Sequence, residues 1–404
     1  MTLSGKTASC LLLTEGAFGS PLHAMRSLHT WGVSVYAATA GSGASILRRS
    51  RYCTAASDHD YADGKTYCRS VINWIDDVRP CGDVVVIPLS DRLVEYLDAG
   101  IDLFPDRFQL AIPPHEVVDR LVVKDRSLTV ADGAGLRVPN WTHVSTESDI
   151  DEASRLALPV AIRPTSWATS GERYFKIEVF RDRQTLVDDL RARIRDGAQM
   201  IAQEYLAVPE DAVEFALLWR NKDRSRTEII TGRKRRQAGR DGGVMIWGET
   251  ASLPDVEASS LRFLDESGFT GLGGAEFIRR DGKLWFIEFN PRLEAIHFLA
   301  TRAGVDTVRL EFADRAGGTS HQRLPKQRPA TAWIGSAWLQ RFVDEPDSRR
   351  QLIADRWRFA RAPRRVRAVW SWADPLPGLM LTGRVASVVA RRFLCRNPKI
   401  RHSP

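Results

Sequence analysis

The chain has 404 residues, of which 43% are hydrophobic and 27% are charged. This composition is ordinary for a globular protein, and the length exceeds one small core, so we expect two or three packed units. The five cysteines are scattered without metal-ligand spacing, which argues against a disulfide framework or a cysteine-based zinc site and favours a reducing compartment. No apolar run reaches the length of a membrane-spanning helix, and we expect a cytoplasmic protein.

The net charge of +8 is concentrated at one end of the chain. Residues 355–404 hold twelve Lys and Arg against two acids, a balance of +10, so the rest of the chain carries −2. The aromatic and basic pattern of an RNA-binding module is missing, and we expect no nucleic-acid partner. Two interpretations of the basic tail stay open: a solvated segment packed on the last domain, which is the simpler one, or a peripheral contact with an anionic membrane or a protein. A homodimer also stays open.

Residues 1–112 alternate between strand and helix signals. The apolar runs at 8–16 and 33–39 read as buried strands, the segment at 21–32 as a helix, and the Val/Ile-rich run at 82–90 as a further strand. Strands and helices that alternate with short joints predict a parallel sheet with crossover helices.

The pattern changes near residue 113. Strand signals at 157–166 and 173–180 are joined by a loop of small polar residues, and the apolar runs at 213–220 and 226–237 read as neighbouring antiparallel strands. We therefore expect a second domain over 113–312 and a C-terminal extension over the remaining residues, 313–404.

The stretch "LWFIEFNPRLEA" ends an apolar strand with a carboxylate, an amide and a guanidinium. Residues two apart in a strand share a face, so Glu288 and Asn290 point to one side, and the preceding strand carries Glu276. Such oxygen ligands suit Mg²⁺, which takes one or two carboxylates and completes its shell with water and phosphate oxygens. Taken alone, this group is more commonly the polar edge of a turn, and only other residues upstream favour the metal interpretation.

The metal interpretation depends on the register of this hairpin. A two-residue turn would pair Glu276 with Ile287 and place the two glutamates on opposite faces. A three-residue loop at 280–282 pairs Glu276 with Phe286 and aligns it diagonally with Glu288. We predict the three-residue loop.

Together these segments resemble the ATP-grasp superfamily. Residues 271–295 resemble its metal-binding hairpin, in which two acids and an asparagine hold Mg²⁺ ions that bridge the ATP phosphates. Four pieces upstream resemble a first phosphate-binding lysine, a second basic residue on a strand, the hinge whose backbone bonds adenine, and a basic strand that reaches the transferring phosphate. In chain order these are Lys124; Arg163; Gln203, Glu204 and Leu206, with Asp211 at the usual position of a ribose contact; and the strand that carries Lys234 and Arg236.

The resemblance covers roughly residues 115 to 310 and implies an α/β fold with three parts. These are an N-terminal parallel-sheet pre-ATP-grasp domain, an ATP-grasp domain with two lobes, and a basic C-terminal extension. The "SRYC" at 50–53 and the "DPLP" at 374–377 are similar to segments of the D-aspartate-ligase-like and carbamoyl-phosphate-synthase-like carboxylate–amine ligases.

The same resemblance implies ATP and Mg²⁺ (or Mn²⁺) as cofactors and assigns roles to residues. Glu276, Glu288 and Asn290 would hold the metal, and Arg292 would meet the substrate carboxylate or the transferring group. Lys234 and Arg236, two residues apart, are expected to share one strand face and to stabilise the same charge.

Two departures from the family pattern stand out. Arg163 replaces the usual lysine, and the two side chains are not interchangeable at close sites. The loop "TSWATSGERYF" has fewer glycines than the usual phosphate-covering lid, although Ser170 and the backbone around Gly171 offer donors to phosphate.

The function that the resemblance implies is that of an ATP-dependent carboxylate–amine ligase. It would activate a small carboxylate, such as that of an amino acid, as an acyl phosphate and join it to an amine. The alternatives are a kinase, a ligase with a thiol nucleophile, and a non-catalytic ATP-binding protein.

Overall fold

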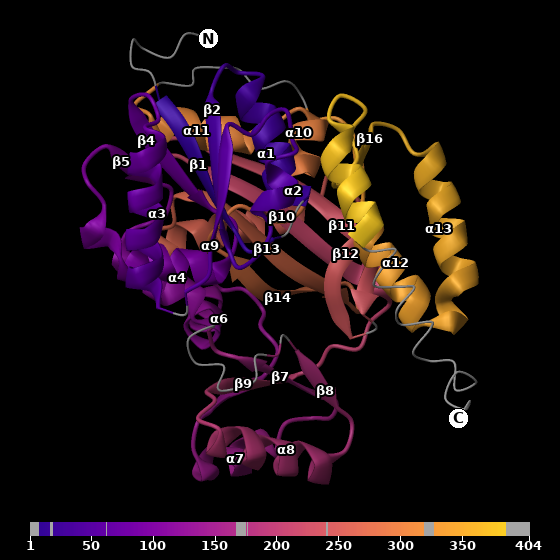
Figure 1. The fold of residues 1–404 in the computed structure, drawn as a ribbon. Coiled ribbons are helices and arrows are strands. Elements are labelled where there is room, and N and C mark those ends of the chain that lie inside the picture. Colours follow the sequence, from indigo (N-terminus) through magenta and orange to yellow (C-terminus); the bar gives the residue numbers. More distant parts are fainter. Residues whose placement is uncertain are drawn as a thin grey trace, which may run out of the picture.

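The structure, a computed structural model, describes residues 8–16, 19–61, 63–166, 175, 177–239, 241–318 and 327–384. It contains three β-sheets with helices packed on them (Figure 1). Ser170, Gly171 and the tail beyond residue 384 lie outside the described residues, so the roles expected for them stay predictions. No helix in the described ranges is long and apolar enough to cross a membrane.

The first sheet is parallel, with the strand order β3-β2-β1-β4-β5. Its strand β1 is buried along its whole length, and alternate side chains enter two apolar clusters on opposite faces, as expected for a strand covered by helices on both sides. The predicted parallel sheet with crossover helices is confirmed. Its elements are β1 (Ala8–Thr14), α1 (Gly19–His29), β2 (Ser34–Ala40), α2 (Ala44–Leu47), β3 (Ala55–His59), α3 (Gly64–Val78), β4 (Asp83–Pro88), α4 (Asp91–Ala99), η1 (Ile101–Leu103) and β5 (Phe108–Leu110).

The strand order of this sheet reverses at β1, which has β2 on one side and β4 on the other. Ligand crevices of parallel α/β sheets lie outside the carboxyl ends of the strands at such a switch point. Here β1 leads to Glu15, and β4 leads to Ser90, which caps α4 by accepting a hydrogen bond from the Leu93 N–H. Polar side chains therefore collect at the expected edge of the sheet.

The second sheet is antiparallel and has the order β6-β9-β7-β8. It forms the lobe at the bottom of Figure 1, where α7 and α8 cover it. The lobe has its own apolar cluster, which joins Val144, Ile162 and Met200 of the sheet to Leu186 and Leu190 of α8. Its elements are β6 (Trp141–Val144), α7 (Glu147–Ala153), β7 (Val160–Pro164), β8 (Glu178–Phe180), α8 (Arg183–Arg195) and β9 (Met200–Glu204).

The third sheet has seven strands in the order β14-β13-β10-β11-β12-β15-β16. The predicted neighbouring strands at 213–220 and 226–237 are β10 and β11, and they pair antiparallel as expected. The elements from residue 115 onward that belong to this part are α5 (His115–Val122), α6 (Lys124–Gly133), η2 (Glu210–Ala212), β10 (Val213–Arg220), β11 (Thr227–Gly239), β12 (Gly242–Thr250), α9 (Pro254–Ser267), β13 (Gly271–Arg280), β14 (Lys283–Asn290), α10 (Phe298–Ala303) and α11 (Thr307–Arg315).

The turn of the β13–β14 hairpin differs from the prediction. Arg280 pairs with Lys283, so the loop has only two residues, Asp281 and Gly282, with φ values of 51° and 73°. An Asp-Gly pair with two positive φ values is the favoured two-residue hairpin loop because its twist matches that of the strands. The predicted three-residue loop is therefore wrong.

A β-bulge nevertheless brings the two glutamates to one face. The ladder runs regularly as far as the pair Phe277–Phe286, then shifts register, and Glu276 pairs with Glu288. The extra residue on β14 is Ile287, which has no partner of its own in the ladder. The bulge thus corrects the register that a plain two-residue turn would impose.

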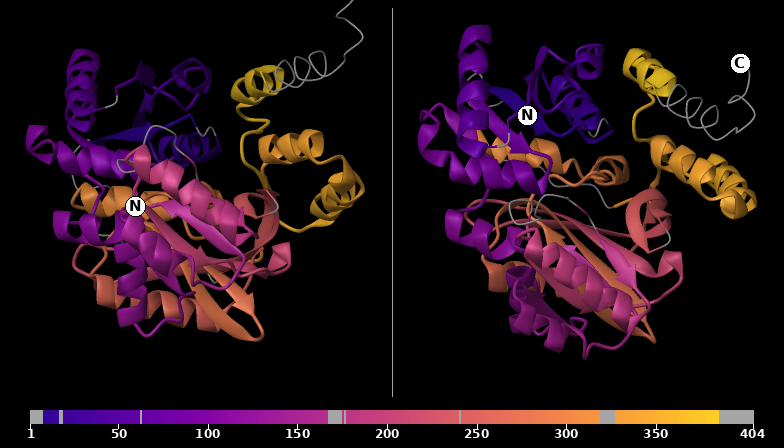
Figure 2. Two further views of the ribbon diagram at one scale, coloured as in Figure 1. Left: turned by 90° about the horizontal axis from the view of Figure 1, so that it is seen from below. Right: turned by 60° about the horizontal axis from the view of Figure 1, so that its bottom comes forward.

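The C-terminal residues join the large sheet through two short strands. β15 (Thr331–Trp333) pairs antiparallel with β12, and β16 (Arg365–Arg367) pairs parallel with β15. Between them, α12 (Gly335–Asp344), η3 (Pro346–Ser348) and α13 (Arg349–Arg361) form a helical pair beside the sheet, on the right in both views of Figure 2. Residues 375–384 are also helical.

A buried carboxylate ties this C-terminal part to the first sheet. Asp374 is 2% exposed and accepts hydrogen bonds from the Ser50 hydroxyl (2.8 Å), the Arg51 N–H (3.1 Å) and the Arg26 guanidinium (3.0 Å). The "SRYC" and "DPLP" segments, far apart in the sequence, therefore meet in space.

Candidate functional site

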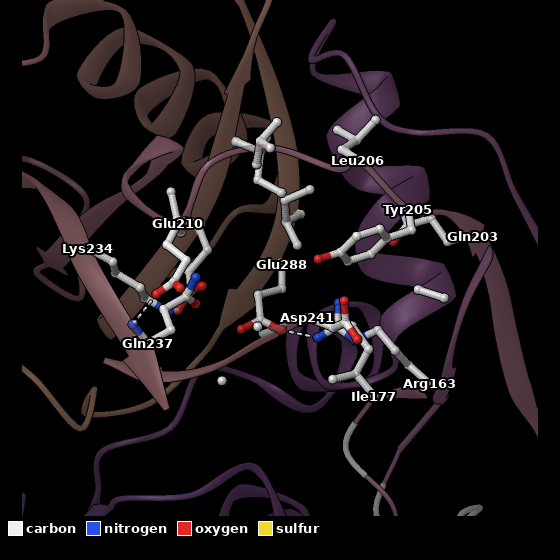
Figure 3. Close-up of a pocket in the computed structure, with 18 of the residues that line it drawn as sticks. Arg163, Ile177, Gln203, Tyr205, Leu206, Glu210, Lys234, Gln237, Asp241 and Glu288 are labelled. Carbon is white, nitrogen blue, oxygen red and sulfur yellow. Dashed lines mark hydrogen bonds and ion pairs between the residues drawn. The ribbon is translucent and has the colours of Figure 1, made fainter. Parts of the chain in front are cut away.

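Two cavities meet at Arg163 and Glu288, which line both of them. The first, the inter-sheet cleft, lies between the four-stranded and seven-stranded sheets, and Figure 3 shows side chains from both walls pointing into it. The second, the switch-point cavity, lies at the carboxyl edge of the first sheet. The lining of the inter-sheet cleft includes Ala161, Arg163, Ile177, Gln203–Leu206, Glu210, Lys234, Gln237, Asp241, Glu276, Ile278, Ile287 and Glu288.

The predicted metal ligands lie along one side of the β13–β14 ladder. Glu276 stands opposite Glu288, and Asn290, which is 7% exposed, stands opposite Gly274. Two carboxylates and an amide suit Mg²⁺ when phosphate or water supplies the other ligands. Within the described ranges, no group of three or more His, Cys, Asp or Glu side chains could hold a metal. A metal at this position would therefore need ligands from a bound molecule.

Both glutamates are paired with the cations predicted to bind phosphate. Arg163, on β7 of the small sheet, forms an ion pair with Glu288 across the cleft, and Lys234 Nζ lies 2.5 Å from Glu276 Oε1. Burial raises the pKa of Glu276, and the neighbouring Glu288 adds to this, while Lys234 opposes it. The cleft is thus lined by pairs of opposite charge. A ligand that carries phosphates and a divalent cation can replace both partners of each pair, with phosphate on the cationic side chain and the cation on the glutamate.

The predicted hinge forms one wall of the cleft where β9 ends. Gln203, Glu204 and Leu206 all line the cleft, and the Glu204 N–H is held by the Asn140 carbonyl at 2.9 Å. The N–H of Leu206 has no hydrogen-bond acceptor among the described residues. Such a backbone N–H beside apolar side chains can donate a hydrogen bond to the edge of a base.

Arg236 lies behind the wall of the inter-sheet cleft and not in it. Lys234 and Arg236 were expected to share a strand face, but β11 shifts register between them. Arg236 instead lies behind the cleft wall, where its Nε donates to Asp355 at 2.7 Å, and Gln237 lines the cleft. The expectation of a shared face is wrong because a bulged strand does not alternate regularly.

Asp211 also points away from the inter-sheet cleft. It lies 3.6 Å from the guanidinium of Arg235 and lines the space behind the wall. The residue before it, Glu210, faces the cleft. The ribose contact predicted for Asp211 stays a prediction.

The switch-point cavity brings Lys124 and Arg292 to the carboxyl edge of the first sheet. Lys124 is the first residue of α6, and Arg292 Nε donates to Asp91 of α4 at 3.0 Å. A second ion pair joins Arg292 to Glu294 at 3.3 Å. Burial lowers the pKa of Arg292, but Asp91 and Glu294 outweigh it, so the net shift is upward and Arg292 stays cationic.

The side chain of Glu294 packs closely against the backbone of Gly274 on β13. A Cβ atom on Gly274 would lie 2.4 Å from Glu294 Cγ, so only glycine leaves room for this side chain. The Glu294 Oε1 atom is buried without a hydrogen-bond partner in the described part of the chain. An unpaired carboxylate oxygen beside Arg292 is a polar group that a ligand could satisfy.

Comparisons with known proteins agree on the fold. No family model matches the chain. The chain is 24% identical over 281 residues to the carbamoyl phosphate synthase large chain of Thermoplasma acidophilum, an alignment that covers 66% of this chain and 26% of that protein. The chain therefore spans about a quarter of the length of this curated relative.

Solved structures share the architecture at low identity. N5-carboxyaminoimidazole synthetase from Staphylococcus aureus, complexed with ADP, has a TM-score of 0.63 and 13% identity, covering 86% of this chain and 88% of that one. The biotin carboxylase–β-γ-ATP complex from Campylobacter jejuni has a TM-score of 0.61 and 14% identity, covering 80% of this chain and 74% of that one. The chain adopts the ATP-grasp fold. The predicted fold class is confirmed, whereas the predicted domain boundaries stay a prediction.

Within this ATP-grasp fold, several residues of both cavities were missed by sequence reasoning. Glu210 and Gln237 line the inter-sheet cleft, and Glu15, Asp91 and Arg92 line the switch-point cavity. A signal for the second set was present: both strands next to the switch point end in charged residues, and parallel strands place these at one edge. No comparable signal marks Glu210, because its orientation depends on partners distant in the sequence.

The residues of this ATP-grasp cleft fit a magnesium nucleotide. Gln203 Nε2 and Arg163 Nε are buried donors without a partner among the described residues, and both residues line the cleft. Oxygen ligands and cations lie at one end, and the hinge backbone lies on another wall. The donor set therefore suits base, phosphate and divalent cation together.

Proposed function

We propose that the protein is an ATP-dependent ligase that activates the carboxylate of a small amino acid as an acyl phosphate and joins it to an amine. The observation that carries this proposal is the meeting of the two cavities at Arg163 and Glu288. One cavity has the groups for a magnesium nucleotide, and the other has the groups for a small charged substrate. A phosphoryl group at the junction would be within reach of both.

The switch-point cavity supports an amino acid as the substrate. Its charges are paired, Arg292 with Asp91 and Arg92 with Glu15. A substrate with only one charge would leave one partner of a pair uncompensated, whereas a zwitterion can replace both members of a pair. We assign the substrate carboxylate to Arg292 and its ammonium group to Asp91 or Glu15.

The chain's own residues supply position and charge neutralisation in the first step. Arg292 would hold the substrate carboxylate, one oxygen of which attacks the γ-phosphorus while the bond to the ADP oxygen breaks. Arg163 and Lys234 would exchange their glutamate partners for phosphate oxygens and stabilise the charge that develops there. Mg²⁺, held by Glu276, Glu288 and Asn290, would supply further neutralisation of the phosphates.

In the second step, an amine nitrogen attacks the acyl carbon, the bond to the phosphate oxygen breaks, and inorganic phosphate leaves. The phosphate is a far better leaving group than the oxide that a free carboxylate would have to expel. The amine must be neutral to attack, so its proton passes to a base. Glu294, with its unpaired oxygen beside Arg292, is our candidate for orienting that amine.

The proposal is tested by measuring ADP release over pairs of amino acids and amines in the presence of Mg²⁺. We expect release that depends on both substrates, and hydroxylamine should trap the acyl phosphate as a hydroxamate. The Glu288→Gln variant should lose at least about 100-fold in turnover, because one oxygen ligand and one carboxylate charge are removed together. Glu257→Gln, on the exposed surface of α9, is the matched control and should retain full turnover.

Other outcomes would favour the alternatives. A stable phosphorylated product without amide formation would indicate a kinase, and a thioester would indicate a thiol nucleophile. Nucleotide binding without substrate-dependent ADP release would indicate a non-catalytic binding protein. Equal turnover in Glu288→Gln and Glu257→Gln would remove the metal role of Glu288.

A further inference from the structure

A residue of the C-terminal helical pair binds Glu210, which lines the inter-sheet cleft. Arg341, on α12, is 4% exposed and binds Glu210 with both terminal nitrogens: Nη1 lies 2.7 Å from Oε2 and Nη2 lies 2.8 Å from Oε1. The same Nη1 donates to the Gln237 carbonyl at 2.6 Å, and Nε donates to Glu345 at 3.0 Å. Such a two-point guanidinium–carboxylate contact fixes the orientation of a carboxylate more strictly than a single bond.

A second arginine, Arg236, binds the same carboxylate. Arg236 Nη1 lies 3.2 Å from Glu210 Oε1, and its Nε donates to Asp355 of α13, which is fully buried. Both helices of the C-terminal pair therefore hold the same carboxylate, α12 directly and α13 through Arg236. Because this network is buried, removing one partner would leave the others uncompensated and would destabilise the protein.

Glu210 lines both the inter-sheet cleft and the space behind its wall. Figure 3 shows Glu210 beside Gln237 and Lys234 on the wall of the cleft. Burial raises the pKa of Glu210, but Arg341 and Arg236 outweigh it and the net shift is downward. An ionised carboxylate repels phosphate and accepts hydrogen bonds, and apart from the base amino group a nucleotide offers it only the sugar hydroxyls.

We propose that Arg341 is a positioning residue for nucleotide recognition, which orients Glu210 to accept hydrogen bonds from the sugar hydroxyls. The inference rests on the proposed function. It makes the C-terminal helical pair part of the nucleotide site although neither helix contributes a side chain to the lining of the cleft.

The test compares the binding of ADP and of 2′,3′-dideoxy-ADP by calorimetry in the presence of Mg²⁺, using the full chain. The wild-type protein should prefer ADP by on the order of tenfold or more, as expected for hydrogen bonds to a charged acceptor. The Arg341→Met variant should bring the ratio of the two dissociation constants close to one, and Arg341→Lys should restore part of it because the charge returns without the fork. This ratio does not depend on the fraction of folded protein.

Two further variants separate positioning from general stability. Arg358→Met removes an exposed arginine whose Nη1 lies 3.1 Å from Oδ1 of Asp355, the oxygen that Arg236 Nε does not use, and should leave the ratio unchanged. Glu210→Gln should abolish the preference by itself, and adding Arg341→Met to it should change nothing more. In turnover, Arg341→Met should raise the KM for ATP with little change in kcat.

The outcomes distinguish the inference from the proposed function. A wild-type protein that binds neither nucleotide would overturn both. A wild-type protein that binds ADP and dideoxy-ADP equally would overturn the inference alone, as would an Arg341→Met variant that keeps the wild-type preference.

Discussion

At the scale of single residues, Arg163 illustrates how an unusual side chain can fit a familiar position. It is 6% exposed and reaches from the small sheet to Glu288 on the large one. A guanidinium can contact one carboxylate and still offer other nitrogens, and its Nε has no partner in the described part of the chain. The departure from lysine therefore does not by itself argue against phosphate binding.

A buried histidine next to the switch-point cavity gives a prediction about pH. His297 is 2% exposed, and its Nδ1 lies 3.0 Å from the Ser20 hydroxyl and 3.1 Å from the Glu294 carbonyl. Burial lowers the pKa of His297 to about 4, from its usual 6.5, although the Glu294 carbonyl opposes this. The unfolded chain therefore binds a proton at a higher pH than the folded chain does. The stability that His297 contributes is present above pH 6.5 and is lost as the pH falls toward 4.

The expected result is a smaller loss of stability in a His297→Gln variant. Between pH 7 and pH 5 the wild-type protein should lose about 2 kcal/mol more in its free energy of unfolding than the variant does. Urea unfolding at both pH values measures this difference. His115→Gln is the control of opposite sign, because the contact with Asp98 raises the pKa of the exposed His115, whose contribution is lost as the pH rises. An equal pH dependence in wild type and His297→Gln would contradict the prediction.

At the scale of elements, the β13–β14 hairpin contains one residue more than its pairing needs. Phe286 and Phe289 point into the core on one side of β14, while both Ile287 and Glu288 line the inter-sheet cleft on the other. The bulge thus adds an apolar group to the cleft without moving the carboxylates out of register.

Deletion of Ile287 should therefore be tolerated by the fold. The shortened strand would pair Phe286 with Phe277 and Glu288 with Glu276 in a regular ladder, with every remaining side chain on its present face. We expect a small change in the melting temperature and roughly tenfold weaker binding of MgADP, because one apolar side chain is lost from the cleft. Calorimetry and thermal unfolding measure the two effects.

The matched control is the deletion of Trp285. With the turn unchanged, that deletion would move Phe286, which is 1% exposed, out of the core and onto the cleft side. Ile287 would take its core position, and replacing a buried phenylalanine by a smaller side chain should make this variant less stable than the Ile287 deletion. Similar melting temperatures for the two deletions would show that the bulge is not the site of the extra residue.

The elements could be predicted from the sequence far better than their irregularities. The strands at 8–16 and 213–220 were found because a buried strand reads as an apolar run, and the parallel sheet followed from alternation with helices. The bulges in β11 and β14 were not found, because whether a strand stays regular depends on what packs against it. The same limit hid the separation of Arg236 from Lys234. It also hid the orientation of Glu210, which Arg341 contacts from 131 residues away.

At the scale of the whole molecule, Asp374 joins the two ends of the described chain. Its carboxylate is the shared acceptor of Arg26 on α1 and of Ser50 and Arg51 in the turn between α2 and β3. The sequence left open whether the basic tail packs on the last domain or makes a peripheral contact, and Asp374 within it binds the N-terminal part of the chain.

An Asp374→Ala variant should therefore lose roughly 3–5 kcal/mol of stability, because it leaves the buried Arg26 without its carboxylate. Combining it with Arg26→Met should cost less than the sum of the two single changes, since both remove the same contact. Asp347→Asn, at an exposed position of η3, is the control and should stay within about 0.5 kcal/mol of wild type. Chemical denaturation gives all four values, and additive effects would argue against the pairing.

This contact also has a consequence during synthesis. Asp374 lies 324 residues after Ser50, so a ribosome that adds 5–20 residues per second makes the acceptor roughly 16 to 65 seconds after its donor. During that interval the Arg26 guanidinium and the Ser50 hydroxyl lack the carboxylate that accepts their hydrogen bonds in the folded protein. The N-terminal part of the chain can collapse early, but it reaches its final form only after Asp374 has been made.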